Sequence, residues 1–424
     1  LAAVLDKAGY NAWREFYVND AGNQIEKFGC SLEARYLQIF KGDEIEFPED
    51  GYQGEDIKDL AKEYADLNGD SLVNVSAEER KKALVDYALP KNIKKMQADM
   101  EKYKIFYDKW FFESELHKSG AVKAVVDLLT KKGLTYEKDG AVWYKNKEVL
   151  TQKLLKEGKS QKYIDNLELK DDVLIRQNGN PTYFTADIAY HKNKFDRGFT
   201  TLIDVWGADH HGHVMRMKGA MDAIGYDGDK LNVVLMQLVK LVKDGELVRM
   251  SKRTGKAIQL GDLLDEVPVD SARFLFNTKE ANTQMDFDLD LAVSQDNQNP
   301  VYYVQYAHAR ICSIFKSLAK EGISPRECTD AELALLTAPE EKELINHLAS
   351  YTNEIISAAK DYDPTKVTRY VTQLATLFHK FYNACRVKGE DEALTQARLA
   401  LCESVKVVIK NVLTMFNISC PESM

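Results

Sequence analysis

The feature that most constrains the fold is a change of pattern near residue 292. Before it, short β-branched and apolar runs, such as 201–206 and 231–239, alternate with helical patterns. Beyond it the strand signals stop, and apolar residues recur at helical spacing over 300–320, 363–381 and about 391–416. Alternating strands and helices indicate an α/β domain, whereas helical patterns alone indicate a bundle. The sequence therefore predicts an α/β part followed by an all-α part.

Weaker signals subdivide the first part. Residues 1–9 are typical of the last turns of an amphipathic helix closed by a glycine, and 11–18 are rich in aromatic and β-branched residues, as strands are. The stretch 32–110 has a mostly helical and polar pattern. Asp139-Gly140 and Asn178-Gly179 are turn pairs next to extended runs, which predicts hairpins in a small β-containing insertion.

Composition excludes several classes of protein. The six cysteines are scattered without a Cys-x-x-Cys pair, which argues against a disulfide framework or a structural zinc site and favours a reducing compartment. No apolar run approaches the ~20 residues that a membrane span needs, and the first residues carry no signal-peptide pattern. The formal net charge of -9 argues weakly against nucleic acid, but local basic surfaces decide that question.

One local basic surface is a loop near residue 250. From Lys240 to Lys256 there are six basic residues against two acidic ones, and Gly245 supplies a hinge. Mobile cationic donors suit a transferring phosphate, because negative charge on its oxygens must be neutralised. The alternative is an ordinary solvated charge run. The string 254–257 is superficially similar to a phosphate-binding Walker loop, but it lacks the upstream glycine and the final Ser or Thr.

Several strings carry a resemblance to a known family. Arg249-Met-Ser-Lys-Arg253 is similar to the KMSKS signature of class I aminoacyl-tRNA synthetases. Tyr183-Phe-Thr-Ala-Asp-Ile-Ala-Tyr-His191 resembles a motif specific to arginyl-tRNA synthetases, and 205–212 resembles that family's strand-end ATP motif. Further similar strings, which together span nearly the whole chain, are 17–24, 286–291 and 299–310.

The resemblance implies a fold with two main parts. It implies an α/β, Rossmann-like class I catalytic domain with an inserted subdomain, followed by an all-α anticodon-binding bundle. The expected limits are 1–32 for a remnant of the first Rossmann half and 33–110 for a mostly helical connection. A catalytic segment with the β-containing insert would cover 111–181, the second Rossmann half with the basic loop 182–291, and the anticodon-binding domain 292–424.

Two departures from the family pattern shape the expectations. The second class signature, a His-x-Gly-His near the first strand, would precede Leu1 and is absent. The segment 210–213 has similar letters, but it follows a late strand and is rejected as that signature. We therefore expect a sequence that begins inside a domain, without the upstream tRNA-elbow domain, and that activates little arginine by itself. The lysine-rich stretch 145–172 is longer than expected.

The arginine site needs carboxylates, because a guanidinium is a planar fork of five donors that keeps its charge. By resemblance, Glu113 and Asp187 supply them and Tyr183 shapes the wall. Tyr183 and Asp187 are four residues apart, so they share a face if the segment is helical. An ordinary surface acid is the alternative for Glu113. A wrong amino acid would leave desolvated acids unpaired, so no editing domain is expected.

The nucleotide site follows from the same resemblance. Gly207 permits close approach of the backbone, Asp209 accepts from ribose hydroxyls, and His210 is a second contact. Mg²⁺ would accompany ATP through its phosphates, without zinc. The neighbouring histidines point in different directions on a regular backbone, which argues against a metal. In the basic loop, Lys252 would stabilise the pentavalent phosphorus, while the residues that close the loop and contact ATP would be Arg249, Met250, Ser251 and Arg253.

The bundle would bind the anticodon loop of tRNA(Arg). Exposed aromatic and basic side chains can stack on or bond to splayed bases. The candidates are Tyr302, Tyr306, His308, Arg310, Asn383 and Arg386, with Tyr303 beside them, although spacing alone assigns half of the aromatics to the core.

Taken together, the resemblance implies ATP-dependent ligation of L-arginine to tRNA(Arg) through an arginyl-adenylate, by a cytoplasmic monomer without membrane contact. Two alternatives stay open. A related class I enzyme, such as the cysteine one, would need zinc ligands that the sequence lacks. A non-catalytic tRNA-binding module derived from a synthetase would bind RNA but not the amino acid.

Overall fold

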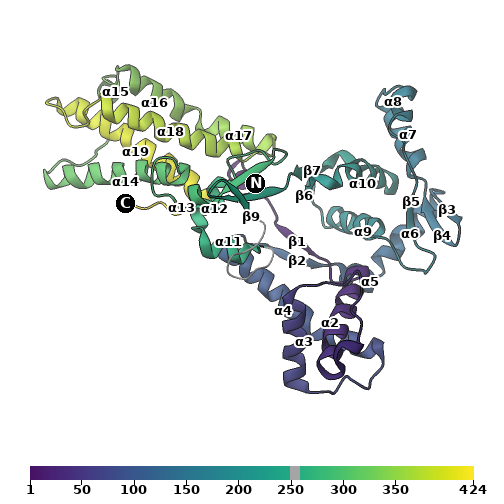
Figure 1. Cartoon of the computed structure of the whole chain (residues 1–424). Helices are drawn as coiled ribbons and strands as arrows, with labels where there is room; N and C mark the ends of the chain where they lie inside the picture. The colour runs from purple at the N-terminus through teal and green to yellow at the C-terminus, as the bar shows by residue number, and fades with distance from the viewer. Residues whose placement is uncertain (249–257) are drawn as a thin grey trace. The chain divides into compact units, whose positions relative to one another are not determined.

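The computed structural model describes residues 1–248 and 258–424, which form two compact units. Unit 1 contains residues 1–13, 99–106 and 234–424, and unit 2 contains 14–98 and 107–233. The elements of both units are labelled in Figure 1.

Unit 2 contains a short parallel strand pair that ends beside a helix. Strand β1 (Glu15–Val18) pairs with β2 (Lys109–Phe112), which places Tyr17 opposite Phe111. Helix α5 (Glu113–Lys118) follows β2 directly, so its first residue lies at the carboxyl end of this pair. The predicted strand at 11–18 is therefore present, but only its second half forms it.

Farther along the chain, unit 2 contains a helix, a strand and a second helix in succession. Helix α9 (Tyr183–Asp196) leads to β6 (Leu202–Gly207), the 3₁₀ turn η2 (Ala208–His210) and α10 (His211–Ile224). A second turn, η3 (Gly228–Lys230), precedes β7 (Leu231–Met236), which pairs with β6 and passes from unit 2 to unit 1. Helix α9 packs against α10 and against α6 (Ala121–Lys131).

The insertion predicted from turn signals is a three-stranded antiparallel sheet. Its strands are β3 (Thr135–Lys138), β4 (Ala141–Tyr144) and β5 (Asp172–Ile175). Asp139 and Gly140 both have positive φ, at 53° and 73°, as a two-residue hairpin turn between twisted strands requires. The second predicted hairpin is reduced to one bridge, between Ile175 and Pro181. The lysine-rich stretch forms α7 (Asn146–Lys156) and α8 (Gln161–Asp165).

The predominantly helical stretch before β2 is confirmed, and its helices have a core of their own. It contains α2 (Asn23–Lys41), η1 (Gly42–Glu44), α3 (Glu55–Asn68) and α4 (Ala77–Lys102), and α4 continues through Pro90. Leu32, Tyr36, Ala61 and Leu84 are buried together between these helices. A separate core, which includes Phe111, Ile188 and Met217, holds α6, α9 and α10 around the strands.

Unit 1 contains a small mixed sheet. Strand β8 (Val239–Lys243) pairs parallel with β10 (Met285–Asp288) and antiparallel with β9 (Glu246–Val248). The single strand expected over 231–239 is therefore wrong, because β7 ends at Met236 and β8 joins another sheet. Three short helices cover this sheet's core: α11 (Leu260–Glu266), α12 (Val269–Leu275) and α13 (Leu289–Val293).

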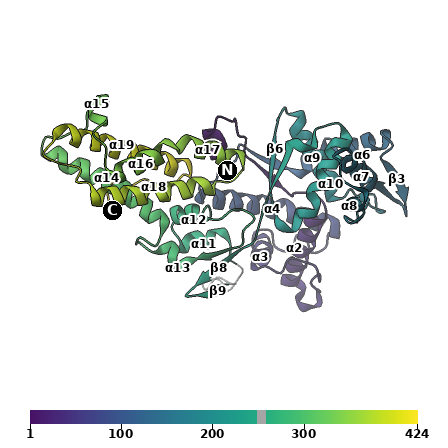
Figure 2. The same cartoon turned by 90° about the horizontal axis from the view of Figure 1, so that it is seen from above.

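The rest of unit 1 is the predicted bundle. Helices α14 (Pro300–Lys320), α16 (Pro339–Ala349), α18 (Thr365–Ala384) and α19 (Glu392–Met415) run along one another in Figure 1 and Figure 2. The shorter α15 (Asp330–Leu333) and α17 (Tyr351–Lys360) complete it, and α1 (Ala2–Lys7) packs on α17 and α19. The α18 face expected to be apolar is buried: Val367, Tyr370, Val371, Leu374, Phe378 and Phe381.

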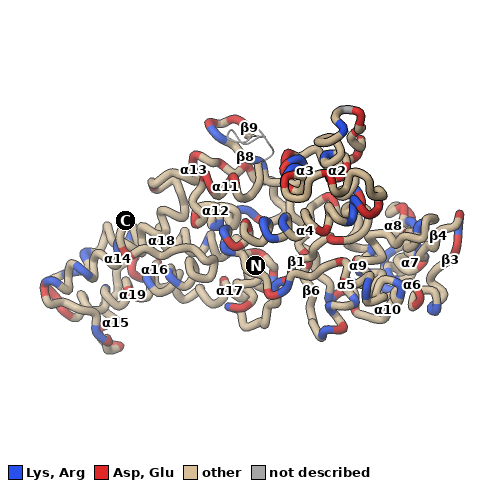
Figure 3. The backbone as a smooth tube through the Cα atoms, turned by 90° about the horizontal axis from the view of Figure 1, so that it is seen from below, with Lys and Arg blue, Asp and Glu red and all other residues tan. Residues whose placement is uncertain are grey.

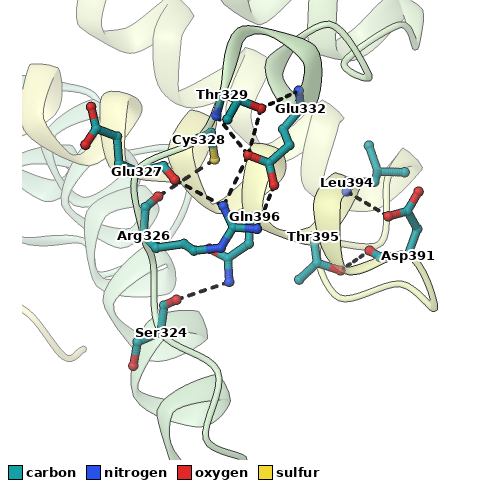
Figure 4. Close-up of polar contacts among 10 residues, drawn as sticks. All are labelled: Ser324, Arg326, Glu327, Cys328, Thr329, Glu332, Asp391, Leu394, Thr395 and Gln396. Carbon is teal, nitrogen blue, oxygen red and sulfur yellow. Dashed lines mark hydrogen bonds and ion pairs between the residues drawn. The ribbon is translucent and has the colours of Figure 1, made fainter.

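A polar network fastens the loop before α15 to the start of α19 (Figure 4). Arg326 forms an ion pair with Glu332 at 2.6 Å, and Glu332 also accepts from the Thr329 backbone N–H at 2.8 Å. The Arg326 backbone N–H donates to Gln396 on α19 at 3.2 Å, while the Gln396 amide donates to Ser324.

Basic and acidic residues are interspersed along the chain (Figure 3).

Candidate functional site

Two carboxylates predicted to bind the substrate lie near each other in unit 2, around the hydroxyl of Tyr17. Glu113 begins α5, Asp187 lies in the second turn of α9, and Tyr17 is on β1. Burial raises the pKa of Tyr17, and the charges of Glu113 and Asp187 raise it further. Asp187 also raises the pKa of Glu113. Three elements therefore bring two acids and a protonated phenol to one place.

Glu113 is the more deeply placed of the two acids. Its exposed fraction is 3%, and burial is the largest cause that raises the pKa of its carboxyl group. His117 lies one turn later on α5, with its Nε2 3.3 Å from Glu113 Oε1, and it lowers the pKa of Glu113. Gly22 lies against the same oxygen: a Cβ at that position would be 3.8 Å from Oε1, and its φ of 72° disfavours any side chain.

Asp187 is held from the side by helix α10. Its Oδ2 is 3.2 Å from Nε2 of His213, and Nδ1 of His213 is 2.9 Å from a guanidinium nitrogen of Arg216. Arg216 also forms an ion pair with Asp172 on β5. Asp187 keeps about a third of its side chain exposed, at 32%, so one end of the carboxylate remains accessible.

A buried ionic triad fixes the backbone below Asp187. His191 Nδ1 donates to the Asp187 carbonyl at 2.7 Å, and its Nε2 contacts Asp204 on β6. Lys194 contacts the other Asp204 oxygen at 2.8 Å. Burial alone would raise the pKa of Asp204, but the charges of His191 and Lys194 outweigh burial and lower it. The triad ties α9 to β6.

Tyr17 is a site residue that sequence reasoning missed. Its hydroxyl is buried and lies beside the Glu113 carboxylate. Its ring packs on Tyr190 with centroids 4.6 Å apart, which aims the hydroxyl at the two acids. The loop after β1 is held by Asp20, whose Oδ1 accepts from the Ser114 backbone N–H at 2.8 Å. The signal was the resemblance at 17–24, from which no single residue was selected.

Tyr183 lies on the same helix face as Asp187. It is the first residue of α9, and 40% of its surface is exposed. The spacing of four residues on a helix places the two side chains one above the other. Tyr183 and Asp187 therefore share one face of α9.

The three residues predicted for the nucleotide lie where β6 ends. Gly207 closes the strand, and a Cβ on it would come within 2.5 Å of Asp209 Oδ1. The side chains of Asp209 and His210 are 82% and 58% exposed, with Oδ2 and Nε2 3.7 Å apart. Trp206, the residue before this turn, packs with its ring 5.3 Å from His213 and 6.3 Å from His210.

The basic loop cannot be placed beside these groups. Its predicted residues, Arg249, Met250, Ser251, Lys252 and Arg253, lie outside the described residues. The strand before it, β9, pairs antiparallel with β8. The loop therefore does not follow a parallel strand directly.

In the bundle, some of the predicted RNA-binding side chains form one group. Arg310 donates to the Tyr306 hydroxyl at 3.0 Å and lies 4.7 Å from the centre of the Tyr382 ring. Tyr303 and Tyr306 pack on His379 at 4.9 Å and 5.6 Å. Burial, followed by the charge of Arg310, lowers the pKa of His379. We call these residues the α14–α18 aromatic cluster: Tyr303, Tyr306, Arg310, His379 and Tyr382.

The other predicted RNA-binding residues lie apart from this cluster. His308 is only 3% exposed, and its Nδ1 donates to the Pro421 carbonyl at 2.9 Å, which is a core position. Tyr302 is partly buried on α14. Asn383 and Arg386 are exposed at and just after the end of α18. His379 and Tyr382 were missed, because helical spacing alone does not distinguish a packed aromatic from an accessible one.

The described residues contain neither a metal-binding cluster nor a helix suited to a membrane. Among them, no group of three or more His, Cys, Asp or Glu side chains could hold a metal ion. No helix in the described part of the chain combines the length and the apolar character that crossing a bilayer would need.

Comparison with protein families assigns both parts of the chain. Residues 1–312 match the family described as tRNA synthetases class I (R), catalytic domain. Residues 304–424 match the DALR anticodon binding domain.

Individual relatives agree with both matches. The chain is 54% identical to an arginine–tRNA ligase of Ruminiclostridium cellulolyticum and 55% identical to one of Caldanaerobacter subterraneus, in each case over 100% of this chain and 72% of the relative. The fold is similar to that of Thermus thermophilus arginyl-tRNA synthetase, with a TM-score of 0.75 at 20% identity, covering 100% of this chain and 78% of that one. Neither alternative, the cysteine enzyme or a module without catalysis, gains support from these similarities.

Proposed function

The chain belongs to the arginyl-tRNA synthetases of class I, and we propose that Glu113, Asp187 and Tyr183 hold the guanidinium of arginine in this enzyme. The enzyme attaches L-arginine to its tRNA. Its class uses ATP for this ligation, and our proposal adds which of its side chains recognise the amino acid.

The observation that carries the proposal is the environment of Glu113. A carboxylate that is 3% exposed and lies beside a second acid is poorly stabilised when it is charged, and His117 and the Tyr17 hydroxyl offset this only in part. A bound guanidinium offsets this, because it brings a delocalised positive charge and paired donors that match carboxylate geometry. Only a long cationic side chain with several donors satisfies both acids at once.

The same arrangement supplies selectivity. Lysine presents a compact ammonium with three donors and lacks the planar fork, while citrulline has the fork shape without the charge. Either one leaves a buried acid incompletely paired, which costs about 1–3 kcal/mol and more for a charged group. Discrimination by unpaired polar groups is strong enough to work without an editing site.

For the nucleotide we propose contacts at the end of β6. Gly207 lets the backbone approach the base or ribose, while Asp209 and His210 are exposed and free to turn towards it. We further propose that Mg²⁺ enters with ATP through the phosphates. Lys252, with Arg253 and Arg249, would neutralise the charge that develops on the α-phosphate as arginyl-adenylate forms, and Met250 and Ser251 would contact the nucleotide.

For tRNA we propose that the α14–α18 aromatic cluster stacks on unpaired anticodon-loop bases. Its rings and the Arg310 guanidinium offer the surfaces that single-stranded RNA readers use. Asn383 and Arg386, exposed at the end of α18, and Tyr302 would extend this surface. His308 would support α14 from the core.

We also propose domain limits and a cellular setting. The bundle from residue 292 onward would act as the anticodon-binding domain, behind catalytic segments at 1–32, 111–181 and 182–291 and a helical connection at 33–110. The setting would be that of a monomer in the cytoplasm, where the six unpaired cysteines suit a reducing compartment.

Isothermal titration calorimetry with arginine, lysine and citrulline tests the arginine site. Glu113→Gln and Asp187→Asn are expected to weaken arginine binding by roughly 30- to 5,000-fold, because removing one partner of a buried charge pair costs about 2–5 kcal/mol. The affinity for citrulline should change much less. The control is Glu115→Gln, since Glu115 lies exposed on the same helix α5 with its carboxylate 3.4 Å from Lys109.

Two results would overturn the assignment. One is an arginine affinity that neither Glu113→Gln nor Asp187→Asn reduces. The other is an equal loss in Glu115→Gln, which would mean that any change of charge on α5 has the same effect.

A further inference from the structure

We propose that His213 is a positioning residue for arginine recognition, and that Arg216 and Asp172 set its tautomer and orientation so that one oxygen of Asp187 faces the substrate. The inference rests on the proposed role of Asp187 as an arginine-binding carboxylate. Four side chains from three elements form the chain of contacts: Asp172 on β5, Arg216 and His213 on α10, and Asp187 on α9.

The hydrogen bonds determine where the His213 proton lies. A guanidinium has donors only, so Arg216 must donate to Nδ1 of His213 over the 2.9 Å that separates them. Nδ1 is then an acceptor without a proton. The ring is therefore neutral and carries its proton on Nε2, which donates to Asp187 Oδ2 at 3.2 Å.

Arg216 is itself anchored. Its guanidinium pairs with Asp172, whose side chain is 13% exposed, and lies 5.6 Å from the centre of the Phe184 ring. Burial raises the pKa of Asp172, while the Arg216 charge acts in the opposite direction. Asp172 is fixed in turn by its strand, where it stands opposite Tyr144 in the β4–β5 register.

The His213 ring has little freedom to turn. The Phe184 ring lies 5.5 Å from it at a steep angle, and the Trp206 ring lies 5.3 Å from it. Its side chain is 13% exposed. The ring is therefore held in one orientation by aromatic neighbours and in one tautomer by Arg216.

Two consequences for recognition follow. The first is geometric: with Oδ2 bound to His213, the carboxylate plane of Asp187 is fixed and its remaining lone pairs are presented to the substrate. The second is electrostatic: a neutral imidazole leaves the Asp187 charge in place for arginine, whereas an imidazolium would compete with the guanidinium for it. The contact chain thus orients the Asp187 carboxylate and leaves its charge available for the guanidinium of arginine.

Three variants separate these roles. His213→Phe keeps a ring but removes the donor to Asp187, and His213→Gln restores a donor amide near the same place. Arg216→Met removes the donor that fixes the tautomer. Calorimetry on the full chain should show arginine binding weakened about tenfold or more in His213→Phe and Arg216→Met, because hydrogen bonds to charged groups are stronger than those between neutral groups. His213→Gln should stay within about threefold of the unchanged protein, as expected for a restored donor.

The affinity for citrulline distinguishes a positioning role from a purely structural one, because a structural defect would lower the affinities for arginine and citrulline alike. Because the contact chain acts on a charged pairing, the ratio of arginine to citrulline affinity should fall in His213→Phe and Arg216→Met. The matched control is Lys218→Met, which removes a cation from the same helix, where Lys218 lies 3.9 Å from Asp229. This control should leave both affinities unchanged.

A double-mutant cycle completes the test. If His213 acts through Asp187, then His213→Phe adds no further loss of arginine affinity in an Asp187→Asn background. An equal loss in both backgrounds, or failure of His213→Gln to recover affinity while the protein remains folded by circular dichroism, overturns the positioning role. A different result, in which Asp187→Asn alone leaves arginine affinity unchanged, refutes the proposed arginine site rather than the contact chain.

Discussion

His191 lies one turn after Asp187 on α9, and its Nδ1 donates to the Asp187 backbone carbonyl over 2.7 Å. Its other nitrogen faces Asp204, so both ring nitrogens of His191 face acceptors. The helix turn that carries a substrate-binding side chain is therefore fastened to strand β6 by buried charges.

Removal of the Asp204 charge should destabilise unit 2. Asp204→Ala leaves His191 and Lys194 without their shared carboxylate, and breaking a buried ion pair costs about 3–5 kcal/mol. Urea denaturation followed by circular dichroism at pH 7.5 measures this loss. The control is Asp196→Ala at the end of α9, where Asp196 is half exposed and pairs with Lys192; this change should cost much less.

The stabilisation of the fold by Asp204 should also persist in weak acid. Its folded pKa is lowered, so the stabilisation is complete above the unfolded pKa of about 3.9 and declines only as the pH falls towards the lowered folded value. The stability difference between the unchanged protein and Asp204→Ala should therefore persist at pH 5. A difference that disappears between pH 7 and pH 5 would contradict an ionised Asp204 in the fold.

Glu113→Gln should make the ligand-free protein more stable while impairing binding. The folded pKa of Glu113 is raised, mainly by burial, so its ionisation costs stability once the pH exceeds its unfolded pKa, and the cost is complete above the folded pKa. The variant should show a higher urea midpoint at pH 7.5 and no advantage near pH 4. A lower midpoint at pH 7.5 would mean that Glu113 is well satisfied without a ligand.

Arginine binding should release protons in weakly acidic buffer. Burial, and to a lesser extent the Asp187 charge, raise the pKa of Glu113, so its carboxyl group keeps its proton to a higher pH than an ordinary glutamate does, while a bound guanidinium favours the ionised form. At pH 5.5 the observed binding enthalpy should therefore depend on the ionisation enthalpy of the buffer. The dependence should shrink at pH 8, and Glu113→Gln should reduce it at pH 5.5.

The α14–α18 aromatic cluster should matter for tRNA and not for arginine. Tyr306→Ala and Arg310→Ala are each expected to weaken tRNA binding by roughly 5- to 150-fold, since stacking of a base on an aromatic side chain contributes about 1–3 kcal/mol. Filter binding at fixed salt measures tRNA, and calorimetry measures arginine. Lys316→Ala, which removes an exposed cation from the same helix, controls for charge alone. Equal losses in all three variants would argue for charge rather than stacking.

Much of the fold was predictable, because strong local patterns decided it. The helix over 300–320 and the final helix were expected almost residue for residue, since a proline at the first turn of α14 and Asp391 before α19 mark their starts. The Asp139-Gly140 turn was expected because few residue pairs tolerate two positive φ angles. The split of 231–239 into β7 and β8 was missed, because a continuous apolar run does not reveal where a chain changes sheets.

The site was only partly predictable for a similar reason. Motif resemblance selected Glu113, Asp187 and Tyr183, which lie on α5 and α9. It did not select Tyr17 or His213, whose importance depends on contacts between residues far apart in the sequence. The pairing of Arg216 with Asp172, 44 residues away, follows from packing of α10 near β5 and has no signal in the spacing of either residue.

The location of Trp206 gives the protein a built-in optical probe. Its indole lies within ring-contact distance of His191, His210 and His213, which belong to three separate parts of the site. With only four tryptophans in the chain, replacing the other three with phenylalanine would isolate its emission. Fluorescence from this one indole could then follow events at the end of β6 in real time, without any attached dye.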